Sequence, residues 1–176
     1  LNTKSSVSFA KQKVKSEKAE NDFVLDNGNI YWDMLDGVFF ANTDKVIAFS
    51  GKLQKEESVR NLKFELYQAD GTIALVSLDN EKVENSSHML LSIGSDAVNK
   101  GTSYRSKYII EKIGSESIAY NMVYGKISLK LPYDANIYSL SSDGTRKELL
   151  SKELDNEGNT VFYLTGELNY EIVRRN

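Results

Sequence analysis

The sequence predicts an all-β protein, most simply a two-layer antiparallel β-sandwich of the jelly-roll or Ig-like type. Turn dipeptides recur between apolar segments, at Asn27-Gly28, Asp36-Gly37, Asp70-Gly71 and Asp143-Gly144. Asn-Gly and Asp-Gly favour the positive φ angles of tight hairpin turns. Between the turns, polarity alternates with a period of two, and the ten tyrosines and seven phenylalanines suit pleated surfaces.

The N-terminal half contains seven expected strands, each rich in β-branched or aromatic residues. The first four are Phe23–Asp26, Ile30–Met34, Val38–Asn42 and Val46–Ser50. Residues 62–66 alternate strictly between apolar and charged side chains, which places one face on a core and the other in water. Thr72–Leu78 and His88–Ile93 follow. The segment Ser50–Arg60 lacks such a pattern and is expected to be a long loop.

The C-terminal half continues the same pattern. Tyr104–Ile110 is expected to be one strand, and 126–131 alternates up to the only proline, Pro132, which would end the strand. The remaining expected strands are 137–141, Arg146–Leu150, Thr160–Leu164 and Tyr170–Val173. About a dozen strands at this spacing are typical of a sandwich or barrel.

The first 21 residues differ from the rest. Ala10–Glu20 is rich in Lys, Glu and Ala but offers only Val14 as an apolar anchor, which is too narrow a stripe to hold a helix on a core. We therefore expect residues 1–21 to be a connection or edge segment and 22–176 to be the sandwich domain. Because the chain begins at Leu1, we expect an excised piece of a longer protein.

Composition excludes several classes of protein. The 176 residues carry a net charge of −3, whereas a dedicated nucleic-acid binder has a basic excess. No cysteine is present, so disulfides, thiolate metal sites and cysteine nucleophiles are excluded. No apolar run approaches the roughly 20 residues needed to span a membrane.

Several stretches, taken in order, resemble a known group of domains. They are Asp26–Asp33 with Gly37–Phe40, Ser86–Ser92 with Ala97–Gly101, Gly125–Leu129, Ile137–Leu140, Asp143–Arg146 and Leu168–Ile172. This set resembles the C-terminal all-β accessory domain, similar to a carbohydrate-binding module, that follows the (β/α)₈ catalytic barrel of some bacterial glycoside hydrolases. The sequence departs from the pattern at Asn29, where an acidic residue is common, and at Ser95-Asp96, where the loop is often basic.

The resemblance implies a non-catalytic module of a polysaccharide-degrading enzyme, outside the cell or on its surface. Its partner would be the catalytic barrel of the same chain, and a plant or microbial polysaccharide could be its ligand. The alternative is a structural or adhesive sandwich domain of a cell-surface protein that has no affinity for carbohydrate. A sandwich fold alone does not decide between them, because unrelated functions use it.

Exposed aromatic rings would stack on pyranose faces, so five side chains are candidates for carbohydrate binding. They are Trp32, Tyr31, Tyr104, Tyr108 and Tyr133. Alternation sends Tyr31 and Trp32 to opposite faces of a strand, so only one of them could line a given surface. The simpler expectation is that Trp32 fills the core.

Oxygen-rich segments offer a possible calcium site at Asp155 and Glu157 or at Asp96 and Asn99, although both are equally good turn compositions. No other cofactor is indicated. The only histidine, His88, follows Ser86 and Ser87, but neighbouring strand residues point to opposite faces. We therefore expect no catalytic residue.

Overall fold

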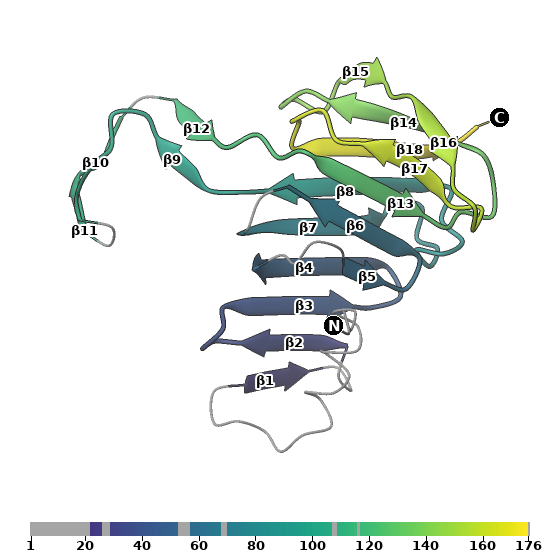
Figure 1. Cartoon of the computed structure of the whole chain (residues 1–176), viewed down its shortest axis with the longest axis horizontal. Helices are drawn as coiled ribbons and strands as arrows, with labels where there is room; N and C mark the ends of the chain where they lie inside the picture. The colour runs from purple at the N-terminus through teal and green to yellow at the C-terminus, as the bar shows by residue number, and fades with distance from the viewer. Residues whose placement is uncertain are drawn as a thin grey trace.

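A computed structural model describes residues 22–25, 29–52, 57–67, 70–106, 109–115 and 117–175. These residues form antiparallel β-strands in two stacked sheets, with two small ladders that extend from one end (Figure 1). The predicted two-layer β-sandwich is confirmed. No helix in the described part of the chain has the length and hydropathy needed to span a membrane.

The larger sheet has nine strands in the order β1-β2-β3-β4-β7-β8-β18-β14-β15. Their bounds are β1 Asp22–Leu25, β2 Ile30–Asp33, β3 Val38–Asn42, β4 Val46–Lys52, β7 Asp70–Ser77, β8 His88–Gly94, β14 Ala135–Leu140, β15 Arg146–Leu149 and β18 Asn169–Arg174. The smaller sheet, in the order β16-β17-β13-β6-β5, contains β5 Glu57–Val59, β6 Leu62–Leu66, β13 Gly125–Leu129, β16 Lys152–Leu154 and β17 Thr160–Tyr163.

The core lies between the two sheets. Inward positions on β6 and β8 alternate strictly with partly exposed ones, as the period of two predicts. Aromatic contacts join the layers: the ring centroids of Phe49 and Phe64 lie 6.2 Å apart, and those of Phe162 and Tyr170 lie 6.5 Å apart. Strands β1, β2 and β3 extend beyond β5, the edge strand of the smaller sheet (Figure 1).

A long excursion between β8 and β13, which we call the arm (residues 97–120), leaves the sandwich (Figure 1). Its base is a ladder of β9 Ala97–Asn99 with β12 Ile118–Tyr120, and its tip is a ladder of β10 Ser103–Ser106 with β11 Ile109–Lys112. The Thr102 hydroxyl accepts a hydrogen bond from the amide of Gly114 at 2.9 Å, which fixes the joint between the two ladders.

Three expectations about the strands are wrong. Asp70-Gly71 is not a turn but the start of β7, where Gly71 pairs with Gly51. The segment Tyr104–Ile110 is not one strand, because β10 and β11 pair with each other and the chain reverses between them. The segment Ser50–Arg60 is not all loop, because β4 runs to Lys52 and β5 lies in it.

Other expectations fall outside the described residues. They concern the Asn27-Gly28 turn, the connection over residues 1–21 and the side chain of Tyr108. By contrast, Gly37 and Gly144 have the left-handed φ angles, +66° and +84°, that the two predicted hairpin turns require.

Candidate functional site

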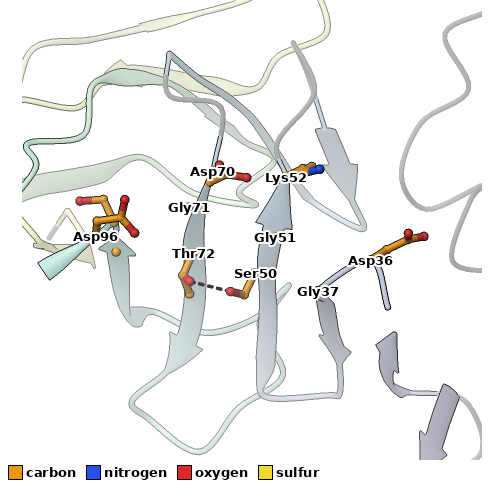
Figure 2. A pocket seen from close by; sticks show the side chains of 11 residues that line it. Asp36, Gly37, Ser50, Gly51, Lys52, Asp70, Gly71, Thr72 and Asp96 are labelled. Carbon is orange, nitrogen blue, oxygen red and sulfur yellow. Dashed lines mark hydrogen bonds between the residues drawn. The ribbon is translucent and has the colours of Figure 1, made fainter. Parts of the chain in front are cut away.

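One depression in the described surface is a groove of about 410 Å³ at one end of the nine-stranded sheet. We call it the end groove; it is lined by Asp36, Gly37, Ser50, Gly51, Lys52, Asp70, Gly71, Thr72, Gly94, Ser95 and Asp96. Figure 2 shows Asp36 and Asp96 on opposite sides, with Lys52 and Asp70 on neighbouring strand ends between them. The groove thus gathers the β2–β3 turn and the ends of β4, β7 and β8.

Three hydroxyl-bearing residues line this groove, and two of them, Ser50 and Thr72, are in contact. Ser50 and Thr72 are cross-strand partners, and their side-chain oxygens are hydrogen-bonded at 2.8 Å (Figure 2). Each hydroxyl carries a donor and two acceptor sites, so one mutual hydrogen bond leaves both able to bond further. Next to Thr72 in the same register is Gly94, which has no side chain to fill the space.

Exposed aromatic rings continue the same row. Trp32 pairs with Phe39, and Phe39 pairs with Ser50, so the three side chains share the outer face of the sheet. The exposed fractions are 47% for Trp32 and 36% for Phe39. The expectation that Trp32 fills the core is therefore wrong. Its ring is exposed, as a carbohydrate-binding residue requires.

Tyr31, its neighbour, is the ring that points inward and is only 2% exposed, so it is not available to a ligand. Its hydroxyl donates a hydrogen bond of 3.2 Å to the carboxylate of Asp33, and Asp33 is also buried. The second carboxylate oxygen of Asp33 accepts hydrogen bonds from the amides of Leu35 and Asp36 and so closes the β2–β3 turn. Tyr31 and Asp33 thus position Trp32 on the outside.

The other aromatic candidates lie elsewhere. Tyr104 is exposed on the arm, away from the Trp32 row. Tyr133 packs partly on the core, and its hydroxyl donates a hydrogen bond to the carbonyl of Ser86. Burial, with the nearby charge of Asp79, raises the pKa of Tyr133 to about 12. The structure therefore does not combine Tyr31, Tyr104 or Tyr133 with Trp32 into one platform, and Tyr108 lies outside the described residues.

The serines and the histidine do not form a nucleophilic pair. The Ser86 hydroxyl donates to Asp79 at 2.8 Å, and the Ser87 hydroxyl donates to the same carboxylate at 2.9 Å. The His88 ring instead contacts Glu171, with 2.8 Å between Nε2 and Oε1. A triad requires the nucleophile and the imidazole to be within hydrogen-bond reach, and these partners prevent it.

The oxygen-rich segment at Asp155 and Glu157 serves as a turn. Asp155 Oδ1 accepts hydrogen bonds from the amides of Glu157 and Asn159, and its Oδ2 accepts one from the Asn159 side chain. These bonds, led by that of the Asn159 side chain, hold the pKa of Asp155 below its usual range. Among the described residues, no three His, Asp or Glu side chains gather in a way that could hold a metal ion.

At the second oxygen-rich segment, Asn99 donates to the carbonyl of Gly114 at 3.1 Å within the arm. Asp96 lies in the end groove, and its carbonyl accepts a hydrogen bond from the amide of Asn121. The two residues predicted as one calcium site thus have separate structural settings.

The arm is a second candidate surface. Its apolar side chains face solvent rather than a core: Val98, Tyr104, Ile109, Ile110, Ile113, Ile118 and Tyr120. Ile113 and Ile118 are 70% and 67% exposed. Soluble monomers rarely display so many neighbouring apolar residues, and such patches mark interaction sites.

Sequence reasoning missed Phe39, Ser50 and Thr72 as members of the site. A signal for Phe39 was present, since a hairpin closed by Asp36-Gly37 puts Trp32 and Phe39 on one face, and the observed register pairs them directly. Ser50 joins the row through the pairing of β3 with β4, but Thr72 joins it only through the pairing of β4 with β7, which are 18 residues or more apart along the chain. Comparisons with known proteins give no match to this chain, whether against family models, curated proteins or solved structures.

Proposed function

We propose that this chain is a non-catalytic accessory module of a polysaccharide-degrading glycoside hydrolase, located outside the cell or on its surface. It packs on the (β/α)₈ catalytic domain through the arm and contributes to holding the carbohydrate. The relation to glycoside hydrolases rests on the ordered sequence resemblance. The docking role rests on the exposed apolar arm.

The arm supports docking because its burial would release substantial free energy. Each isoleucine side chain contributes about 1.5–3 kcal/mol when it is fully transferred from water to an apolar environment. Ile109, Ile110, Ile113 and Ile118 all lie on the arm and are more than half exposed. A partner that covers them would gain this hydrophobic contribution, which the sandwich itself leaves unused.

The shape of the arm supports the same proposal. An isolated two-stranded ladder is at best marginally stable in water. The arm contains two such ladders, and none of the apolar side chains described in it belongs to the core. Contact with a neighbouring domain would supply the missing hydrophobic cover.

The alternative is a structural or adhesive sandwich domain of a cell-surface protein. The apolar arm fits that function equally well, since an adhesive domain also needs a partner. The two functions differ in the partner, which is a glycosidase barrel in one case and another surface protein in the other.

The test measures binding of the purified chain to a purified (β/α)₈ glycoside hydrolase domain encoded by the same gene or operon. Size-exclusion chromatography with light scattering should give a 1:1 complex. The variant Ile110→Asp should weaken the complex at least tenfold, because it places a charge in the buried contact. Leu154→Asp changes an even more exposed apolar side chain on β16, outside the arm, and should have no effect.

Hydrogen exchange provides the second measurement. The amides of β10 and β11 should exchange more slowly in the mixture than in the isolated chain. Separate elution of the two proteins, with unchanged exchange in the arm, would contradict docking on a barrel and favour the adhesive alternative.

A further inference from the structure

We propose that the end groove and the Trp32–Phe39 row form a binding site for a neutral polysaccharide, whose chain runs across the strands. This inference rests on the carbohydrate-binding part of the proposed function and assigns it a location, a set of contacts and a ligand charge. It is independent of the docking role of the arm.

The aromatic pair supplies the stacking surface. Neighbouring strands lie about 4.8 Å apart, and directly paired side chains have Cβ atoms about 4.5–5.5 Å apart. Trp32 and Phe39 are such a pair, so their rings stand side by side on the outer face. Two adjacent exposed rings offer a continuous apolar platform for the C–H faces of successive sugar rings.

Small residues beside the platform leave it accessible. On the same outer face, the row next to Phe39 and Ser50 contains Ala41, Ala48 and Ala74, which are paired across β3, β4 and β7, with Ile30 and Ser92 at its two ends. In the row that contains Trp32, Phe39, Ser50 and Thr72, the last residue is Gly94. A ligand lying on the rings would therefore continue into the end groove without meeting a large side chain.

The size of the end groove suits one or a few sugar rings. Its volume of about 410 Å³ lies within the roughly 300–1,000 Å³ of ordinary ligand sites. Gly51 and Gly71, which are paired across β4 and β7, line the hollow with backbone alone.

The polar groups of the groove match sugar hydroxyls. Ser50 and Thr72 both donate and accept, Lys52 donates, and the carboxylate of Asp70 accepts. Sugar hydroxyls are themselves donors and acceptors, so each of these groups has a complementary partner.

Charge selects among polysaccharides. Three carboxylates, those of Asp36, Asp70 and Asp96, surround the groove, and Lys52 is the one ammonium group that lines it. An anionic chain such as a polyuronate would meet net repulsion in the groove. A neutral glucan, xylan or mannan would not.

Affinity electrophoresis tests the proposal with defined probes. The purified chain is run in native gels that contain a soluble β-glucan, a xylan, a mannan, polygalacturonate or no polysaccharide. We expect retardation by at least one of the neutral polymers and none by polygalacturonate. Trp32→Ala and Phe39→Ala should each weaken that retardation at least tenfold.

Two variants probe the groove without removing a ring. Gly94→Val places two methyl groups in the hollow beside Thr72, whereas the bare Cβ would make only an ordinary contact of 3.4 Å. It should weaken binding at least fivefold. Thr72→Val removes one hydroxyl at constant shape and should weaken binding severalfold. The matched control is Tyr163→Ala, which removes an exposed ring on β17. This variant should be retarded as strongly as the wild type.

The outcomes separate this inference from the docking role. Circular dichroism first establishes that each variant is folded. Absence of retardation in every neutral gel, or retardation that Trp32→Ala and Gly94→Val leave unchanged, overturns the proposed site. The Ile110→Asp variant should bind polysaccharide as the wild type does. If the chain docks on the barrel but binds no polysaccharide, the proposed binding site is wrong while the docking role stands.

Discussion

At the scale of single residues, the carboxylate of Asp79 accepts hydrogen bonds from four neighbouring residues. It accepts from the hydroxyls of Ser77, Ser86 and Ser87 and from the amides of Ser87 and Glu81. Burial alone would raise the pKa of Asp79, but these hydrogen bonds outweigh it and hold the pKa far below its ordinary value. Because Ser77 ends β7 and Ser87 precedes β8, one carboxylate organises the whole connection.

Asp79→Ala should lower the free energy of unfolding at pH 7 by about 2 kcal/mol, because hydrogen bonds to a charged acceptor are lost. The lowered pKa means that the unfolded chain takes up a proton first, near pH 4. The contribution of Asp79 is therefore fully present above that pH and is lost as the pH falls toward the folded-state pKa. Urea unfolding at pH 7 and pH 3 should show the gap between wild type and variant narrowing.

The control for this prediction is Asp44→Ala. Asp44 forms an exposed ion pair with Lys82 at 3.2 Å, and its removal should change stability by less than about 0.5 kcal/mol. A gap between wild type and Asp79→Ala that is the same at both pH values would contradict the assigned role.

Two glycines differ sharply in what a methyl group would meet. A Cβ on Gly125 would lie 2.4 Å from the carbonyl oxygen of Glu65 on the neighbouring strand β6, and backbone cannot move aside easily. A Cβ on Gly94 would lie 3.4 Å from that of Thr72, an ordinary contact. Gly125→Ala should therefore cost at least about 2 kcal/mol, and Gly94→Ala less than about 0.5 kcal/mol, in urea unfolding. Equal stabilities would show that β6 adapts to the added methyl.

Trp32 shows why the site was only partly predictable from sequence. Alternation correctly separates Tyr31 from Trp32, but it does not say which of them is inside. Burying Trp32 would have left the polar Asp33 in water, which is the usual arrangement. The structure reverses it, because the β2–β3 turn amides and the Tyr31 hydroxyl satisfy the Asp33 carboxylate inside. Such a local hydrogen-bond network leaves no periodic signal.

At the scale of elements, backbone conformation decides which turn dipeptides are turns. Asp36-Gly37 and Asp143-Gly144 lie in hairpin connections, and both glycines have a positive φ. Gly71 does not have one, and the pairing of β7 with β4 includes Asp70-Gly71 in a strand. Most strands could be predicted because period-two patterns are local. Strands β9 and β12 could not, since both are three residues long and are held by each other alone within the described sheets.

The arm should be the least protected element of the isolated chain. Its ladders have no buried apolar contacts, whereas β7 and β8 lie in the middle of the nine-stranded sheet. We expect the amides of β10 and β11 to exchange with deuterium at least about a hundredfold faster than those of β7 and β8. Hydrogen-exchange mass spectrometry checks this, and comparable protection in the two regions would mean that the arm is already covered.

At the scale of the whole molecule, the two sheets are interleaved along the chain. The smaller sheet takes β5 and β6 from the first half and β13, β16 and β17 from the second, while the larger sheet takes strands from both halves. Each layer therefore needs strands from both halves of the chain. The end groove and the arm meet just after β8, since Asp96 lines the groove and the arm begins at the next residue, Ala97.

Phe64→Ala tests whether this interleaved structure has a single cooperative core. Phe64 on β6 is 2% exposed and packs on Phe49 across the layers, so its truncation should lower the free energy of unfolding by about 3–5 kcal/mol. Native-state hydrogen exchange should show that loss both at β3–β4 and at β17–β18, which are distant in the chain. The exposed Tyr163→Ala serves as the comparison and should lower neither. A loss of protection confined to the strands next to Phe64 would mean that the two halves of the sandwich unfold independently. The strands around the end groove could then unfold while the rest of the sandwich stays folded.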